Sequence, residues 1–195
     1  KEAKAILIAD EVLTGFGRCG SLFAFQRAEI QPDIIALSKG LTGGFLPMGV
    51  TMTSEEIFDG FVGEDPKLTF WHGHSFTANP LGCAAANASL DLLEKNPNLY
   101  TSFEDRHIPH LTALAKHPKV TRPRVIGTIA AFDIAVDEKE GYLNPSGKII
   151  KEQAMLNGVF LRPLGNVVYL LPPLCLNDAQ LEKCYTAIRA GLDAI

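Results

Sequence analysis

The sequence predicts an α/β fold in which part of a mostly parallel sheet with flanking helices is followed by a small α+β domain. Short, continuous apolar runs at residues 5–9 and 33–37 are typical of strands buried on both faces of a parallel sheet. Segments with helix-start signals separate these runs. The pattern changes after the Asn-Pro-Asn tripeptide at 96–98. We therefore expect one domain over residues 1–95 and a second over residues 96–195.

Composition narrows the class of protein. The chain has 195 residues, of which 47% are hydrophobic and 21% charged, which argues against disorder and allows a sizeable core. A net charge of −4 gives no basic surface for nucleic acid or for an anionic membrane. No apolar run reaches the roughly 18 residues of a membrane span. An apolar strand follows the first four residues directly, without a signal peptide, so we expect a cytoplasmic protein whose visible sequence begins inside a larger chain.

Cysteine and histidine spacing predicts neither disulfides nor a metal site. The four cysteines are far apart and form no CxxC pair, which favours reduced side chains in a cytoplasmic protein. His72 and His74 form one close pair, and His107 and His110 form another at helical spacing. Neither pair has a companion cysteine or carboxylate cluster at ligand spacing, so we predict no bound metal.

The first half is expected to alternate between strands and helices. Ser54 precedes two acidic residues and is therefore expected to cap a helical turn, and Asn79-Pro80 is typical of a helix start. The predicted elements are a strand at 5–9, a glycine-rich loop, a short helix at 21–28, strands at 33–37 and 48–53, a helical turn at 54–58, an extended segment at 69–76 and a helix from 81 to about 95.

The second half is expected to contain longer helices and paired strands. Asn157-Gly158 is a helix-end signal, and the Pro-Leu-Gly-Asn run at 163–166 predicts a hairpin turn. The predicted elements are a polar helix at 99–116, a strand at 124–135, a helix at 146–156, two hairpin strands at 159–162 and 167–171, and a final helix after Asn177-Asp178.

Two charged residues follow the first two predicted strands. Asp10 comes directly after the first strand, and Lys39 follows the second at Ser38-Lys39-Gly40. The carboxyl ends of parallel strands are where ligands bind in open α/β sheets. A buried lysine there would have a lowered pKa and could serve as a nucleophile. Taken singly, Asp10 is also compatible with a loop or cap carboxylate, and Lys39 with a surface amine.

Taken together, these two motifs resemble those of the class III aminotransferases, pyridoxal phosphate (PLP) enzymes of fold type I. The matching runs are Asp-Glu-Val-Leu-Thr-Gly-Phe-Gly-Arg at 10–18 and Pro-Asp-Ile-Ile-Ala-Leu-Ser-Lys-Gly at 32–40. The resemblance implies that Lys39 forms the Schiff base with PLP and that Asp10 pairs with the pyridinium nitrogen. Strand alternation would point Val12 to the same side as Asp10, where the resemblance implies that it packs on one face of the ring.

A third matching run, at 71–80, implies a homodimer with the active site at its interface. In the family, a hydroxyl residue of this run binds the PLP phosphate of the partner subunit, and the match gives that role to Ser75. His74 is expected to contribute mainly its backbone, and Gly73 is assigned to the substrate. Ser75 stands where the family usually has threonine, which keeps the hydroxyl and loses a methyl group. A loop or cap hydroxyl is the alternative interpretation.

A fourth run, at 158–173, resembles the branch of the family that serves biotin biosynthesis. The resemblance implies that Arg162 binds the substrate carboxylate, for which a bidentate guanidinium is suited. The implied substrates are 8-amino-7-oxononanoate and S-adenosylmethionine. The alternatives are another class III aminotransferase with an ω-amino acid, amine or lysine donor, and a catalytically silent relative acting as an assembly domain. The match starts in the middle of the family's subunit, so we expect this chain to be its carboxyl-terminal half.

Overall fold

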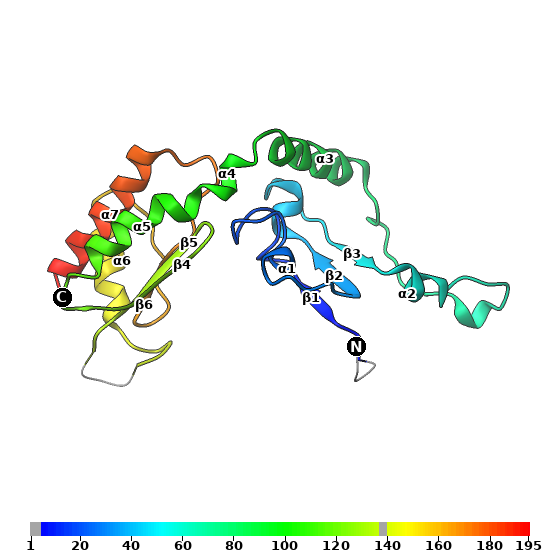
Figure 1. The fold of residues 1–195 in the computed structure, drawn as a ribbon, viewed down its shortest axis with the longest axis horizontal. Coiled ribbons are helices and arrows are strands. Elements are labelled where there is room, and N and C mark those ends of the chain that lie inside the picture. The colour runs from blue at the N-terminus through cyan, green and yellow to red at the C-terminus, as the bar shows by residue number, and fades with distance from the viewer. Residues whose placement is uncertain (1–4, 137–139) are drawn as a thin grey trace. The chain divides into compact units, whose positions relative to one another are not determined.

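The computed structural model describes residues 5–136 and 140–195, which form two compact units on either side of the Pro97–Asn98 bond. Each unit combines helices with a small three-stranded sheet (Figure 1). The α/β class predicted from the sequence is therefore confirmed. No helix in the described residues is both long and apolar enough to cross a membrane.

The strands and α-helices of the first unit follow the predicted order, and two 3-10 helices that were not predicted are added to them. They are β1 (Ile8–Asp10), α1 (Ala24–Arg27), β2 (Ile34–Leu37), the 3-10 helix η1 (Lys39–Thr42), β3 (Val50–Thr53), α2 (Glu55–Asp59), the 3-10 helix η2 (Pro66–Leu68) and α3 (Pro80–Lys95). β1 pairs with β2 in parallel, and Asp10 lies opposite Ala36. β3 pairs with β2 in the antiparallel direction, so the sheet of the described residues is mixed.

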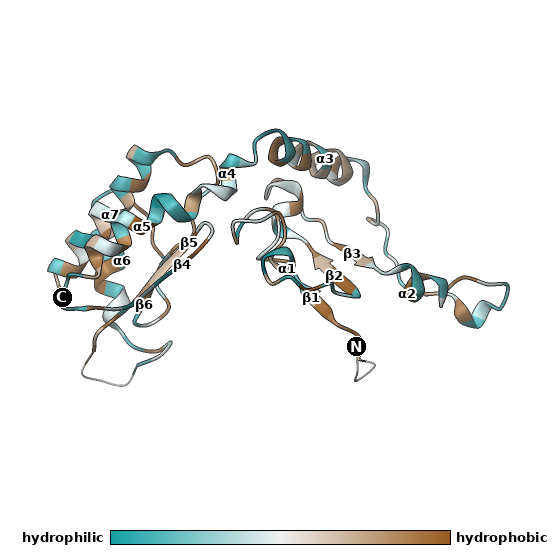
Figure 2. Cartoon of the chain, viewed as in Figure 1, coloured by the Kyte–Doolittle hydropathy of each residue, from teal (hydrophilic) through white to brown (hydrophobic). Residues whose placement is uncertain are grey.

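The expectation that the first strand is buried on both faces is wrong for this chain. Ile6 and Ile8 are each 61% exposed, and β1 lies at one end of the strand order. Figure 2 shows the strongly hydrophobic colouring of β1. The run has the composition of a central strand, but the described residues supply neither a second neighbouring strand nor a cover for it.

Helix caps hold the long helix of the first unit in place. The Asn79 side chain accepts a hydrogen bond from the Gly82 amide at 2.7 Å and Pro80 is the first helical residue, as predicted. From α3, the Ser89 hydroxyl donates to the carbonyl of Gly40 in η1 at 3.2 Å. The helix therefore supports the turn that carries Lys39.

The second unit packs its helices against an antiparallel sheet. Its elements are α4 (Asn98–Thr101), α5 (Phe103–Leu114), β4 (Val120–Ile126), β5 (Ile129–Ile134), α6 (Ser146–Leu156), β6 (Val167–Leu170) and α7 (Asp178–Asp193), with strand order β4-β5-β6. Fully buried Phe132, Ile150, Val168 and Ile188 belong to one hydrophobic core. The helices α6 and α7 have the predicted positions.

Three sequence predictions for this unit are wrong. The single strand predicted at 124–135 is two strands, because Gly127 has φ +52° and turns the chain between β4 and β5. The predicted hairpin partner at 159–162 is not a strand, and β6 pairs with β5 instead. The long polar helix at 99–116 is divided at Ser102 into α4 and α5.

Candidate active site

The parallel pairing of β1 and β2 brings the predicted aspartate and lysine to one edge of the sheet. Asp10 is the last residue of β1, and the next amide, that of Glu11, donates to the carbonyl of Ala36 at 2.9 Å. β2 ends at Leu37, and Lys39 opens η1 two residues later. This edge is where α/β sheets place their ligand-binding groups.

The Asp10 carboxylate is exposed and is held by its own turn. Its Oδ1 accepts a hydrogen bond from the Val12 amide at 3.0 Å. Because β1 ends at Asp10, strand alternation does not orient Val12, and that part of the sequence argument is wrong. The local Asp10–Val12 turn links the two residues instead.

Lys39 is exposed in this chain, which agrees with the surface-amine alternative that the sequence left open. Its backbone φ is +35°, which L-residues seldom adopt and which concentrates at functional sites. Within residues 5–136 and 140–195 its ammonium makes no hydrogen bond or ion pair. The structure thus shows a strained turn whose amine is available to a ligand.

Sequence reasoning missed the role of Glu11, which lies between Asp10 and Val12. Glu11 is only 2% exposed, and its two carboxylate oxygens accept hydrogen bonds from the Thr14 hydroxyl at 2.5 Å and the Phe25 amide at 2.8 Å. The available signal was the adjacent Asp-Glu pair, because two neighbouring acids at a strand end seldom share one environment. Glu11 fixes the loop that follows the candidate ring anchor.

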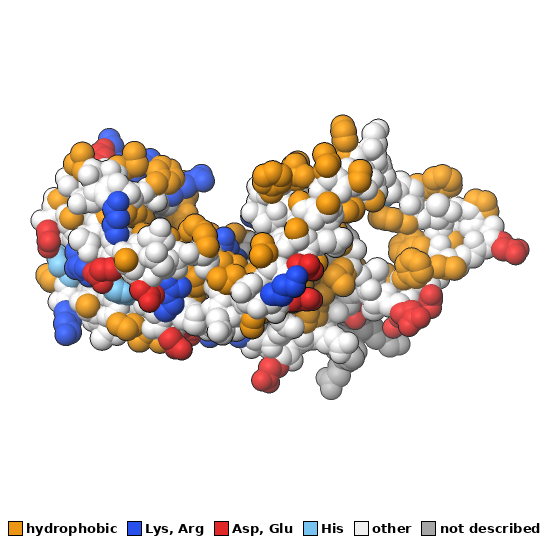
Figure 3. All heavy atoms as spheres, turned by 90° about the horizontal axis from the view of Figure 1, so that it is seen from above, with side chains coloured by type: hydrophobic (Ala, Val, Ile, Leu, Met, Phe, Trp, Pro, Cys, Tyr) orange, Lys and Arg blue, Asp and Glu red, His pale blue; other side chains and the backbone are white. Residues whose placement is uncertain are grey.

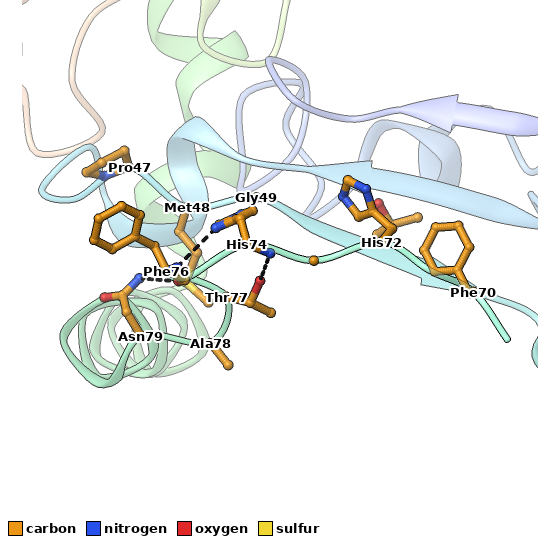
Figure 4. Close-up of a pocket in the computed structure, with 12 residues that line it drawn as sticks. Pro47, Met48, Gly49, Phe70, His72, His74, Phe76, Thr77, Ala78 and Asn79 are labelled. Atoms are coloured by element: carbon orange, nitrogen blue, oxygen red, sulfur yellow. Dashed lines mark hydrogen bonds between the residues drawn. The ribbon is translucent and has the colours of Figure 1, made fainter.

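The extended segment at 70–79 borders a cavity of about 610 Å³ beside the start of β3 (Figure 4). Gly73 and His74 line this cavity. The His74 amide donates to the Thr77 hydroxyl at 3.1 Å, and His74 Nδ1 accepts from the Phe76 amide at 3.2 Å. These bonds stabilise the turn at 75–78, so both the backbone and the ring of His74 shape this segment.

Ser75 opens that turn and is exposed. Its hydroxyl makes no hydrogen bond in the described part of the chain, which leaves it available to an anion. Phe70, Trp71 and Phe76 nearby in the sequence are 65%, 83% and 76% exposed. In Figure 3, hydrophobic side chains gather over much of the visible face of the first unit, to which Ser75 belongs.

Arg162 belongs to the second unit, which is described by itself. It is exposed and lines a cavity of about 550 Å³ together with Phe160, Tyr169 and Lys183. Its guanidinium has no hydrogen bond or ion pair to any other described residue. An unpaired guanidinium beside apolar walls suits a carboxylate on an aliphatic chain.

His107 and His110 serve the packing of the second unit. His107 is fully buried, and its Nδ1 and Nε2 lie 2.7 Å from the Tyr185 hydroxyl and 3.2 Å from the Thr128 carbonyl. A carbonyl only accepts, so Nε2 carries the proton and Nδ1 accepts from Tyr185. Burial lowers the pKa of His107 to about 4. His110 lies 3.3 Å from Glu182, and the described residues hold no cluster of three or more His, Cys, Asp or Glu side chains able to bind a metal ion.

Known proteins match the chain over nearly all of its length. The Synechococcus elongatus protein named adenosylmethionine-8-amino-7-oxononanoate aminotransferase is 57% identical over 99% of this chain and 45% of its own length. The protein of the same name from Geobacter sulfurreducens is 42% identical, over 97% of this chain and 44% of its own. The chain spans about half the length of the curated relatives it matches.

Solved structures give the same result. The adenosylmethionine-8-amino-7-oxononanoate aminotransferase from Methanocaldococcus jannaschii superposes with a TM-score of 0.87 at 34% identity, over 96% of this chain and 46% of the other. A PLP-bound amine transaminase from an uncultivated Pseudomonas species superposes with a TM-score of 0.88 at 31% identity, over 98% of this chain and 45% of the other. The family model for "Aminotransferase class-III" matches residues 1–192. The chain belongs to the class III aminotransferase family.

Proposed function

We propose that the protein carrying this chain is a PLP-dependent aminotransferase of biotin biosynthesis. It would convert 8-amino-7-oxononanoate to 7,8-diaminononanoate, with S-adenosylmethionine as the amino donor. The observation that carries this proposal is the 57% identity, over 99% of the chain, to the Synechococcus elongatus protein of that name. Because the chain spans about half of that relative, the activity is proposed for the whole protein.

The residues at the sheet edge suit PLP, the cofactor of class III aminotransferases. An exposed carboxylate at Asp10 and an unpaired amine at Lys39 flank the edge, and the Ser75 hydroxyl has no partner in the described chain. Asp10, Val12, Lys39, His74 and Ser75 would hold the cofactor. When bound, PLP supplies an electron sink for charge that develops at the substrate carbon.

Each of these residues has a distinct task. Lys39 would hold the cofactor covalently and, once released, carry a proton on Nζ to and from the substrate carbon. Asp10 would keep the ring nitrogen protonated through its negative charge. Val12 would exclude water from one ring face. Gly73 and Arg162 would orient the substrate, with Arg162 paired to its carboxylate.

The assembly and domain assignments belong to the same proposal. We assign residues 1–95 to the carboxyl-terminal part of the PLP-binding large domain and residues 96–195 to the small domain. A cytoplasmic homodimer with Ser75 reaching the partner's phosphate site would explain why Phe70, Trp71 and Phe76 are exposed in a single chain.

A second candidate is a class III aminotransferase with a different amino donor. Solved ω-transaminases from Pseudomonas jessenii and Thermomicrobium roseum superpose at TM-scores of 0.89 and 0.87, at 27% and 29% identity. Their fold is therefore shared with this chain, and the fold alone does not choose the donor.

An amino-donor panel on the full-length protein tests the proposal. We expect 7,8-diaminononanoate to form from 8-amino-7-oxononanoate with S-adenosylmethionine, and no transfer from β-alanine or 4-aminobutyrate. Transfer from those amino acids and none from S-adenosylmethionine would support the second candidate. A full-length protein that neither binds PLP nor transfers an amino group would indicate a silent assembly domain.

A further inference from the structure

We propose that Glu11, Phe16 and Gly40 form a positioning relay that sets the direction of Lys39 relative to Asp10. The relay rests on the proposed function, because its purpose is to place the lysine that would hold the cofactor. None of the three residues is assigned to the chemistry itself. Their contacts connect the end of β1 to the turn after β2.

The first contact is the buried carboxylate of Glu11. Its Oε1 accepts from the Phe25 amide at 2.8 Å and its Oε2 from the Thr14 hydroxyl at 2.5 Å. Phe25 lies in the first turn of α1, where no side chain of the helix's own N-cap residue, Phe23, accepts a hydrogen bond. Glu11 therefore takes over the helix cap and closes the loop over residues 12–25.

The second contact is the ring of Phe16 inside that loop. Phe16 is 4% exposed and has φ +58°, a conformation that costs about 1 kcal/mol for an L-residue. Its ring packs edge-on against Phe23, with centroids 5.6 Å apart. A strained, buried phenylalanine is retained only when its surroundings fix it, and the loop closed by Glu11 does so.

The third contact joins Phe16 to the residue after the lysine. A Cβ atom added to Gly40 would lie 2.9 Å from Phe16 Cβ and 3.1 Å from its Cδ2. Real Cβ atoms do not approach other carbons this closely, so Phe16 can pack here only against a glycine. The ring thus presses on the backbone of η1 directly beside Lys39, whose φ is +35°.

Hydrogen bonds within η1 and to its neighbours also hold this turn in place. The Gly40 carbonyl accepts from the Ser89 hydroxyl of α3 at 3.2 Å, and the Leu41 amide donates to the Ser38 carbonyl at 2.8 Å. The Ser38 hydroxyl donates to the Met48 carbonyl at 2.7 Å. A displacement of Phe16 can therefore move the Lys39 turn only by breaking these contacts.

A double-mutant cycle on the full-length protein tests the contact between Phe16 and Gly40. G40A should weaken PLP binding about tenfold, because overpacking displaces η1. F16G removes the obstructing Cβ and tolerates φ +58°. The double variant F16G/G40A should therefore bind PLP within about threefold of F16G alone. If the loss of PLP affinity in F16G/G40A equals the product of the losses in the two single variants, the relay is overturned.

Glu11 provides a second test, with a conservative rescue and a matched control. E11Q keeps an acceptor for the Phe25 amide, whereas E11A removes it. In the cofactor-free protein, E11A should speed amide hydrogen exchange at Leu41 and residues 12–25, while E11Q and the exposed-acid control E56A should not. In the loaded protein, only E11A should shift the pH midpoint of the visible PLP absorbance. Equal behaviour of E11A and E11Q would overturn the relay.

Failure of the proposed function has a different signature. A wild-type protein that does not take PLP on Lys39, as shown by reduction and peptide mapping, contradicts the function. The relay is tested instead by the ratios of PLP affinity between variants and by amide hydrogen exchange at Leu41 in the cofactor-free protein.

Discussion

At the scale of single residues, the candidate site combines an exposed acid, an unpaired amine and an unpaired hydroxyl. Asp10 and Lys39 share one sheet edge because β1 and β2 are parallel and both end there. Both side chains are exposed: the Asp10 carboxylate accepts from the Val12 amide, and the Lys39 amine has no partner in the described residues. The charges therefore remain available to a ligand, and their removal should affect binding and chemistry more than folding.

Replacing Asp10 by asparagine tests the ring anchor. Asparagine still accepts from the Val12 amide, so the turn is kept, but the negative charge is lost. Loss of one preorganised electrostatic partner should lower kcat about 100-fold or more. Steady-state kinetics of the full-length protein measure this, with the exposed Asp59→Asn as the control. Wild-type kcat in Asp10→Asn would contradict the assignment.

Arg162 can be tested by separating charge from geometry. A hydrogen-bonded charge pair contributes about 1.5–3 kcal/mol, so Arg162→Ala should raise the KM for 8-amino-7-oxononanoate roughly 10- to 150-fold. The KM of Arg162→Lys should lie between those of the wild type and Arg162→Ala, because lysine keeps the charge and loses the bidentate geometry. Lys116→Ala, on the surface of the same unit, is the control. An unchanged KM in Arg162→Ala would remove Arg162 from the substrate site.

At the scale of elements, the second unit is held by a buried polar contact between helices. His107 on α5 accepts from Tyr185 on α7 and donates to Thr128 between β4 and β5. Burial raises the pKa of Tyr185 above its ordinary value, and His110 stacks on the same ring with centroids 4.4 Å apart. Three elements thus depend on a neutral His107.

This contact predicts that the second unit loses stability in acid. The pKa of His107 is about 4 in the folded protein and 6.5 in the unfolded one, so between these values the unfolded state binds more protons. The contribution of a neutral His107 to the free energy of unfolding is fully present above about pH 6.5. It is lost as the pH is lowered towards 4, by about 3 kcal/mol in total. Hydrogen exchange of α7 amides in the full-length protein, corrected for intrinsic rates, measures this loss.

His107→Gln, which does not titrate, should flatten that dependence. His110 and Glu182 also face this region and remain in the variant, so the difference between the two proteins isolates His107. His117→Gln, which lies just after the end of α5, is the control. The same slope with pH in wild type and His107→Gln would contradict the prediction.

Local signals in the sequence predicted the elements that carry their own caps. α3 begins at Asn79-Pro80 and α7 begins after Asn177, because each start is fixed by a side chain next to it. The two-strand structure of 120–134 was missed because a single glycine, Gly127, makes the turn. The pairing of β6 with β5 was missed because strand partners are chosen by tertiary contacts and not by neighbouring turns.

In the candidate site, too, features set by local sequence could be predicted and features set by tertiary contacts could not. Asp10, Lys39 and Ser75 could be proposed from the sequence because their motifs are contiguous. The burial of Glu11 could not, because it depends on a tertiary contact with the Phe25 amide, 14 residues further along the chain.

At the scale of the whole molecule, large apolar side chains remain exposed in the described chain. Trp71 is 83% exposed and Phe76 is 76% exposed, and in the sequence they lie before and after Ser75. Such side chains next to a candidate binding group are typical of an interface. The proposed homodimer would cover them and would also complete the phosphate site.

Replacing Trp71 by alanine should therefore weaken the dimer. Buried interface aromatics contribute about 2 kcal/mol or more, so the dimer dissociation constant should rise about 30-fold. Sedimentation velocity of the full-length protein measures it, with Leu156→Ala, an 80% exposed apolar residue of the second unit, as the control. Equal dissociation constants in wild type and Trp71→Ala would exclude Trp71 from the interface.

We propose that Lys39 of this chain is the lysine that holds PLP. Borohydride reduction of the full-length protein with bound cofactor, followed by peptide mass mapping, tests it most directly. We predict that the cofactor is fixed on Lys39 and that Lys39→Ala leaves no reducible attachment. Cofactor fixed on any other lysine would show that Lys39 does not hold it.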